Sequence, residues 1–196
     1  MGKIYIRERI GIDDLFDLNS LRYVSFCGHI MMQTHSSLFM LEQVLAANPD
    51  ITRIVELGTA YGGSALFFGL HMFGRKDGRV LTLDHSPAMT DEWHILARLL
   101  NVEFRKRDVW NETTVNEVSA FIESGRALIF IDGGNKPREL TLYAPHAKKN
   151  DLIMTHDYAS EIDPKQLTTE TLSLLEPFRQ EEFDELKTRI LSMRKK

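Results

Sequence analysis

Short apolar runs rich in β-branched residues alternate with helix-length amphipathic segments along most of this chain. In such an alternation each helix carries the chain back to the next strand through a right-handed crossover, which produces a parallel sheet. We therefore predict an α/β fold with a mostly parallel sheet flanked by helices. The predicted strands are 53–57, 80–84, 102–107, 127–132 and 152–156, and the helices between them are 64–73, 91–100, 115–124 and 137–147.

The N-terminal part is less regular. Residues 13–47 carry helical patterning, clearest over 37–47, and are rich in Met and Phe. An apolar stripe of this kind is more typical of core packing than of a lid over a substrate. No repeat or Pro/Gly/Ser-rich linker interrupts the chain. We predict one domain over 1–196, with a helical cap over 1–47 and a core over 51–196.

The C-terminal part carries weaker signals after Asp157. The pattern favours a short helix over 170–175. It then favours two strands, 178–183 and 188–193, which we predict to pair as an antiparallel hairpin at the edge of the sheet.

The net charge and the cysteine content of the chain limit which binding partners and which cell compartment we expect. The chain has 24 Lys and Arg against 28 Asp and Glu, a net charge of −4, which gives no electrostatic reason to expect nucleic acid or an anionic membrane. Cys27 is the single cysteine, so no intramolecular disulfide forms, and its apolar neighbours predict a small buried side chain. With no leader peptide and no long apolar run, we predict a cytoplasmic protein.

A glycine-rich turn follows the first predicted core strand. In open parallel sheets, ligands bind beyond the carboxyl ends of the strands, at the switch point of the topology. Gly58 lets the chain leave the strand sharply, Gly62 and Gly63 allow backbone to approach a ligand, and Ser64 is placed to cap the next helix. Glu56 adds a carboxylate that suits a cationic ligand, such as the ammonium and sulfonium of S-adenosylmethionine.

The glycine-rich turn has two alternative roles. A nucleotide-phosphate site is disfavoured, because G-x-x-x-G-G is neither the dinucleotide fingerprint nor the P-loop, and Glu56 would repel a pyrophosphate. A nicotinamide-dependent oxidoreductase is disfavoured for the same reason. The turn also fits a role in packing alone.

Two aspartates follow the turn in the order that a nucleoside site requires. Asp84 ends the second strand, 21 positions after Gly63, close to the spacing at which an acid binds ribose hydroxyls. Asp108, after the third strand, falls near the expected adenine. Taken singly, each fits a turn or a helix cap equally well.

Polar residues also end the fourth and fifth predicted strands. Asp132 follows one, and His156 with Asp157 ends the other, 24 and 25 positions later. Because the carboxyl ends of parallel strands open on one crevice, we expect the three side chains to converge.

Four motifs of the chain resemble the cephalosporin hydroxylase-like and rhamnosyl O-methyltransferase group of class I methyltransferases. They are IVELGTAYGGSALFF, LTLDHS, IFIDGGNKPRELTLYAP and DLIMTHDYA. The resemblance runs from about Gly28 to Asp157 and implies a Rossmann-like fold, S-adenosylmethionine as cofactor, and a transferase. The cofactor contacts that we predict are Glu56, Gly58, Thr59, Ala60, Gly62, Gly63, Ser64, Asp84, His85 and Asp108.

The resemblance also implies a divalent cation, usually magnesium, held after the fourth and fifth strands. Carried over, its ligands are Asp132, His156 and Asp157, which are also the predicted catalytic residues. His156 departs from the acidic or amide residue of the group. An imidazole favours manganese, iron or zinc over magnesium, and it also permits a metal-free site with His156 as general base. A third alternative is that His156 and Asp157 only make hydrogen bonds at the strand end.

We therefore predict a methyltransferase acting on a small-molecule or sugar hydroxyl, and a homodimer is the assembly that we consider. The alternatives are a protein that binds the cofactor without transferase activity, or a hydroxylase of the same family. Lys136 and Arg138 flank the site and either bind an acidic substrate group or face solvent at a helix start. His35 is a further candidate for the rim of the site.

Overall fold

A computed structural model of the protein describes residues 24–196; the part of the predicted N-terminal cap on residues 1–23 lies outside the described residues. Seven strands of the described chain form one sheet in the order β5-β4-β3-β6-β7-β9-β8. The first five in the chain are parallel, and the last two are antiparallel at one edge. Their bounds are β3 Ile51–Leu57, β4 Arg79–Asp84, β5 Val102–Lys106, β6 Arg126–Ile131, β7 Leu152–His156, β8 Leu175–Pro177 and β9 Ile190–Lys195.

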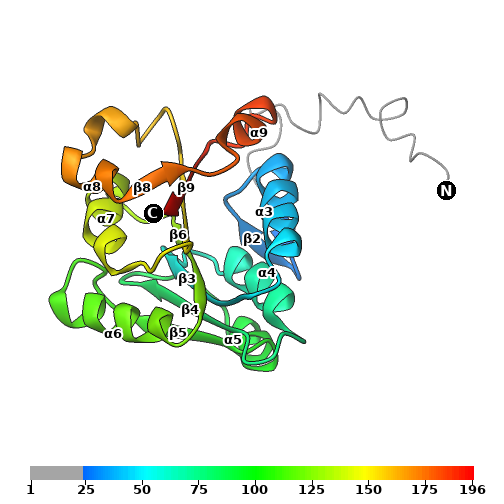
Figure 1. Ribbon diagram of the computed structural model, residues 1–196. Coiled ribbons are helices and arrows are strands. Elements are labelled where there is room, and N and C mark those ends of the chain that lie inside the picture. The colour runs from blue at the N-terminus through cyan, green and yellow to red at the C-terminus, as the bar shows by residue number, and fades with distance from the viewer. Residues whose placement is uncertain (1–23) are drawn as a thin grey trace, which may run out of the picture.

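Helices cover both faces of this sheet (Figure 1). Helices α3, α4 and α9 lie on one side, and α7 and α8 lie on the other. A short hairpin, β1 and β2, packs near α4. The bounds are β1 Val24–Phe26, β2 His29–Met31, α3 His35–Ala47, α4 Gly63–Met72, α5 Asp91–Leu99, α6 Glu112–Glu123, α7 Lys136–Tyr143, η1 Ala144–His146, η2 Pro164–Gln166, α8 Thr169–Ser173 and α9 Gln180–Glu185.

The central strands are apolar on both faces because both faces are buried. Ile54 and Phe130 pack in the cluster that contains α3, α4 and α5, whereas Val55 and Ile129 pack in the cluster that contains α6 and α7. All four side chains are fully buried. This burial accounts for the continuous apolar runs that the sequence shows, and it confirms the predicted α/β class.

The strand order changes direction at β3: β4 and β5 are added on one side of it, and β6 and β7 are then added on the other side. β3 pairs with β4 on one side and with β6 on the other, so the switch point lies beside the glycine-rich turn that follows Leu57. The prediction that this turn lies at the switch point is confirmed.

Two predicted helices have different ends in the structure. The helix predicted over 115–124 begins at Glu112, because the Asn111 side chain accepts a hydrogen bond from the amide of Thr113 at 2.9 Å and caps it. The helix predicted to reach residue 147 ends as an α-helix at Tyr143. Pro145 has no N–H to continue the α-helical pattern, and a single 3₁₀ turn follows.

The C-terminal prediction is partly wrong. Residues 178–183 are not a strand: β8 ends at Pro177, and α9 begins at Gln180. Arg179 has a positive φ of 53°, which breaks an extended run. The Gln180 side chain accepts a hydrogen bond from the amide of Ser192 at 2.7 Å and so ties α9 to β9. A short helix and an antiparallel edge are present as predicted, but α8 spans Thr169–Ser173, and the edge strands are Leu175–Pro177 and Ile190–Lys195.

Cys27 is exposed, which contradicts the predicted burial. It occupies the turn between β1 and β2 with a positive φ of 50°, followed by Gly28 at 82°. Turn residues of a two-residue hairpin point away from the core.

No helix within residues 24–196 is long and apolar enough to cross a bilayer. The predicted cytoplasmic location and the homodimer stay predictions.

Candidate functional site

Two cavities adjoin at the carboxyl ends of the parallel strands. One has a volume of about 620 Å³ and the other about 350 Å³. A shallower hollow of about 960 Å³ lies at the amino-terminal ends of β4 and β5, and no predicted site residue lines it. We therefore place the candidate site in the first two cavities. The residues that line both of them are Gly58, Ala60, Asp132, Gly133 and Gly134.

Gly58 brings the turn after β3 against the end of β6. Its φ is +101°, and a Cβ at this position would lie 2.4 Å from the carbonyl oxygen of Asp132. Its amide donates to the carbonyl of Leu83 at 2.8 Å, while the amide of Asp132 donates to that of Leu57 at 2.8 Å. A glycine is required here by both the backbone conformation and the close approach.

The predicted roles of Gly62, Gly63 and Ser64 need correction. Gly62 and Gly63 do not line either cavity: a Cβ on Gly62 would strike the indole of Trp93, and one on Gly63 would strike Met31 of the hairpin. Gly62 is the N-cap of α4, and Ser64 lies inside the helix without a capping hydrogen bond. The two glycines thus serve packing against protein, while Ser64 lines the larger cavity.

Glu56 lies beneath the turn, 1% exposed, and lines neither cavity. Thr82 donates a hydrogen bond to its carboxylate at 2.5 Å, and the Thr59 hydroxyl lies 2.6 Å from that of Thr82. Burial raises the pKa of Glu56 well above its ordinary value, against the effect of the Thr82 hydrogen bond, and the charge of Asp132 adds to the rise.

The smaller cavity contains the predicted nucleoside residues. Asp84, His85 and Asp108 all line it. Asp84 also accepts hydrogen bonds from the amides of Ala60 at 2.9 Å and Ser86 at 2.7 Å. Asp84 therefore stabilises the turn through these hydrogen bonds, as the sequence allows, and it also lines the cavity.

Sequence reasoning missed part of this wall. Trp110 lines the smaller cavity, and the exposed Arg138 guanidinium lies 4.4 Å from the centroid of its ring. Glu139, fully buried, also lines it. Tyr143 supports the wall from behind, since its hydroxyl donates to the carbonyl of Val109 at 2.6 Å. Of these, only Arg138 was named from the sequence, as a residue that flanks the site. A signal for Trp110 was its place two positions after Asp108.

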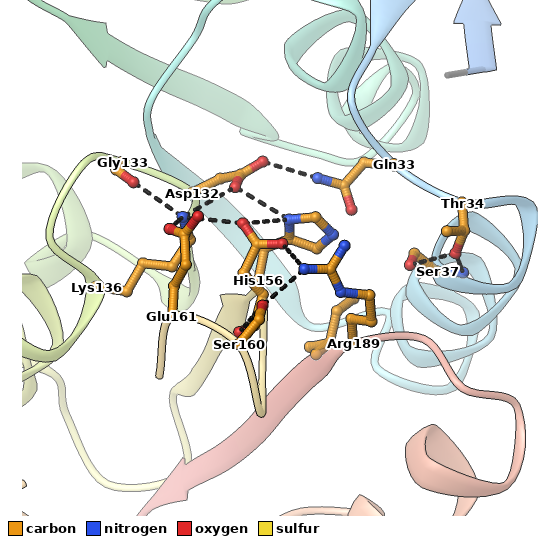
Figure 2. A network of polar contacts seen from close by, with 12 residues as sticks. Gln33, Thr34, Ser37, Asp132, Gly133, Lys136, His156, Ser160, Glu161 and Arg189 are labelled. Atoms are coloured by element: carbon orange, nitrogen blue, oxygen red, sulfur yellow. Dashed lines mark hydrogen bonds and ion pairs between the residues drawn. The ribbon is translucent and has the colours of Figure 1, made fainter. Parts of the chain in front are cut away.

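Asp132, His156 and Asp157 converge as predicted, in the larger cavity (Figure 2). One donor atom of each lies within 4.8 Å of the others. His156 Nδ1 lies 3.2 Å from Asp132 Oδ1 and 3.4 Å from Asp157 Oδ2. Gln33, which precedes α3, donates to Asp132 Oδ2 at 2.8 Å. These four residues form what we call the polar centre.

Charge shapes the pKa values in the polar centre. Burial by itself lowers the pKa of His156, but the negative Asp132 and the hydrogen bonds to Asp132 and Asp157 outweigh it and raise the pKa to about 9. Burial raises the pKa of Asp157, but the hydrogen bond and charge of His156, with the charge of Lys136, bring it well below its ordinary value.

Lys136 does not face solvent at the start of α7. It is 4% exposed, and its ammonium lies 3.1 Å from Asp157 Oδ2 and 2.7 Å from Glu161. Arg189, which precedes β9 and which the sequence did not signal, lies 2.6 Å from Asp157 Oδ1. Of the remaining rim candidates, Arg138 is exposed above Trp110, and His35 is exposed at the first turn of α3 and lines neither cavity.

The donor set by itself has the spacing of a cation site, but its surroundings do not fit one. Both oxygens of Asp157 already face a cation, Lys136 on one side and Arg189 on the other. Lys136 also lies 3.8 Å from Asp132 Oδ1. A divalent ion would bring a third positive charge against these two, so the arrangement accepts a metal only if Lys136 moves away.

The family model described as "Rhamnosyl O-methyltransferase/CmcI" matches residues 19–172, well over half of the chain. The chain belongs to this family. Membership in the CmcI family confirms the resemblance that the motifs indicated, and with it the enzyme class, an O-methyltransferase. Among curated protein sequences, none matches the chain.

Solved structures of CmcI share the fold. An apo structure of CmcI aligns with a TM-score of 0.63 at 17% identity, covering 88% of this chain and 76% of that one. A CmcI structure with magnesium and S-adenosylmethionine aligns with a TM-score of 0.60 at the same identity and coverage. At this identity the likeness shows the Rossmann-like fold, and the roles of the individual site residues stay predictions.

Proposed function

We propose that the protein transfers the methyl group of S-adenosylmethionine to a hydroxyl oxygen of a small molecule. The family supports the reaction class. Solved CmcI structures are described with S-adenosylmethionine and magnesium, and with S-adenosylhomocysteine, which supports the cofactor. A metal is not part of the proposal, because Lys136 and Arg189 already compensate Asp157 here.

The observation that carries the proposal is the wall that the two cavities share. A cofactor that lies along Gly58 and Ala60 reaches into both cavities. Its nucleoside then occupies the smaller cavity, and its methyl group faces the larger one, which has room for an acceptor. Both volumes fall within the range of ordinary ligand sites.

The smaller cavity offers matching groups for a nucleoside. We assign the ribose hydroxyls to Asp84, and the adenine to the wall formed by Asp108, Val109 and Trp110, with His85 at the rim. A carboxylate is the acceptor that a diol requires, and an aromatic face suits a purine. Thr59 and Ser64 line the larger cavity, where the amino-acid part of the cofactor would lie.

Chemically, the acceptor oxygen attacks the methyl carbon as the carbon–sulfur bond breaks, and the sulfonium becomes a neutral thioether. The hydroxyl proton must leave as the oxygen gains the methyl group. Asp132 lines both cavities, so its carboxylate is the group placed to receive that proton. Gln33 and His156 hold this carboxylate from two sides. Alignment of the two reacting atoms supplies much of the acceleration in such a reaction.

Calorimetric titration tests the cofactor. We expect S-adenosylmethionine and S-adenosylhomocysteine to bind and NAD not to bind. Asp84→Asn should weaken binding about tenfold or more, as expected for a lost hydrogen bond to a charged group. Asp91→Asn, at the exposed start of α5, is the control and should leave affinity unchanged. Absence of binding by either sulfur nucleoside would refute the proposal.

Turnover tests the reaction. Formation of S-adenosylhomocysteine is followed with a panel of hydroxylated small molecules, including sugars. Asp132→Asn should lower kcat at least about a hundredfold, within the range found for a general base, while cofactor affinity changes only a few-fold. Cofactor binding without turnover of any acceptor would favour the alternative of a binding protein without transferase activity.

A further inference from the structure

Lys136 is held among oxygen atoms at the centre of the candidate site (Figure 2). Its ammonium donates to the carbonyl of Gly133 at 3.0 Å and to Glu161 at 2.7 Å, and it lies 3.1 Å from Asp157. An ammonium has three N–H donors. Three oxygens at these distances therefore satisfy it completely, with Asp132 as a more distant fourth at 3.8 Å.

The local position of Lys136 does not favour a lysine. It is the first residue of α7, capped by Asn135, and the N-terminus of a helix prefers negative charge. Burying a lysine also removes its ammonium from water at a considerable cost. Lys136 therefore neither stabilises the start of α7 nor increases the solubility of the protein. Its burial indicates that the ammonium serves contacts with residues from other parts of the chain.

That role is visible in what the ammonium contacts. Asp132 and Asp157 come from the ends of two neighbouring strands, and two such carboxylates repel each other unless positive groups offset their charge. His156 contacts both of them from one side, and Lys136 approaches both from another. Lys136 faces Asp132 Oδ1 and Asp157 Oδ2, the two carboxylate oxygens that also lie nearest to His156 Nδ1. The ammonium and a divalent ion would compete for the same oxygens.

We propose that Lys136, which shares Asp132 and Asp157 with His156 and shares Asp157 with Arg189, occupies the place of a divalent metal at this site. Methyl transfer by this chain then requires no added metal. Lys136 acts here as a positioning residue, through the two carboxylates. The statement about methyl transfer rests on the proposed function, whereas the statement about metal binding does not.

Metal binding gives the first test, with Mn²⁺ followed by the electron paramagnetic resonance signal of the free ion. We expect the wild-type protein to bind Mn²⁺ at most weakly. Lys136→Met removes the ammonium and keeps an apolar side chain of similar bulk. It should bind Mn²⁺ at least about tenfold more tightly, because it removes the positive charge that lies nearest to both carboxylates from the side of α7. Lys136→Arg keeps the charge and should not gain affinity. Lys165→Met, at an exposed lysine, is the matched control.

Activity gives the second test. Wild-type turnover should be the same in EDTA and in Mn²⁺, whereas Lys136→Met should be slow in EDTA and partly restored by Mn²⁺. A wild-type protein that binds Mn²⁺ tightly, or that loses turnover in EDTA, would overturn the proposal. So would a folded Lys136→Met protein without increased Mn²⁺ affinity. If that variant does not fold, the wild-type and Lys136→Arg measurements still decide.

The two proposals fail separately. If no acceptor is methylated under any condition, the proposed function is wrong, and the Mn²⁺ titrations still report whether Lys136 excludes a metal.

Discussion

The buried carboxyl of Glu56, below the glycine-rich turn, should make the unfolding free energy of the protein depend on pH. It is 1% exposed and accepts a hydrogen bond from Thr82. Burial raises its pKa well above the ordinary value. An unfolded chain therefore releases this proton at a lower pH than the folded chain does. Stability from the neutral carboxyl is fully present below the unfolded pKa and is lost as the pH rises toward and through the folded pKa.

The variant Glu56→Gln removes the ionisation and keeps a side-chain oxygen to accept from Thr82. The amide changes the unfolding free energy by some amount that is the same at every pH. The informative quantity is therefore how the difference in unfolding free energy between variant and wild type changes with pH. In that window the difference in unfolding free energy should move in favour of the variant by about 1.4 kcal/mol for each pH unit. Between pH 5 and 8 the change cannot exceed about 4 kcal/mol.

Urea unfolding, followed by circular dichroism at several pH values from 5 to 8, measures this difference. Glu185→Gln, at the exposed end of α9, is the control, and its difference from wild type should not follow this trend. A Glu56→Gln difference that is equally flat would refute the reasoning, because it would mean that the folded protein accommodates the charge without penalty.

The same variant tests the charge argument that the sequence suggested. Because Glu56 lines neither cavity, we expect its affinity for S-adenosylmethionine to stay within about threefold of wild type, well under the factor of ten that 1.4 kcal/mol represents. A loss of tenfold or more would mean instead that the ionised carboxylate serves the positive charges of the cofactor.

Two further predictions concern the cavity walls. Gly58→Ala should lower the unfolding free energy by at least about 2 kcal/mol in a urea titration, because the position has a positive φ and a Cβ there would lie 2.4 Å from the backbone of Asp132. Gly134→Ala, where a Cβ meets open space, is the control and should change the unfolding free energy by less than about 0.5 kcal/mol. Equal effects of the two variants would contradict the geometry. Tyr143→Phe removes the 2.6 Å hydrogen bond to Val109 and should cost about 1–3 kcal/mol with weaker cofactor binding, and unchanged values of both would contradict a supporting role for Tyr143.

The core could be predicted from sequence because its strands obey a simple rule. Strands that are buried on both faces are mostly apolar, and four such runs, β3, β4, β6 and β7, separated by helices leave few alternatives. The segment around α9 obeys no such rule. Its conformation depends on Gln180, whose side chain binds the amide of Ser192, and on the burial of Phe183 in the core. Contacts between distant residues are not visible in a local pattern.

The same distinction applies to the site. Asp132 and Asp157 directly follow strands and His156 is the last residue of one, so the topology alone places them together. The sequence marks Lys136 only as a flanking residue, because a lysine at a helix start normally faces solvent. Its burial depends on Glu161, which comes from the loop after β7. Nothing in the local sequence of either residue shows that the two meet.

The antiparallel strands at the C-terminal edge complete the polar centre. β9 pairs with β7 so that Ile190 lies opposite His156. The residue before it, Arg189, is therefore brought beside Asp157, and the amide of Tyr158 donates to the carbonyl of Arg189 at 2.9 Å. Three carboxylates gather around Lys136, and one cation cannot balance them. His156 lies against two of them, and Arg189, the residue that leads into β9, adds a further cation at the third side of Asp157. The edge of the sheet therefore contributes to the charge of the site as well as to its stability.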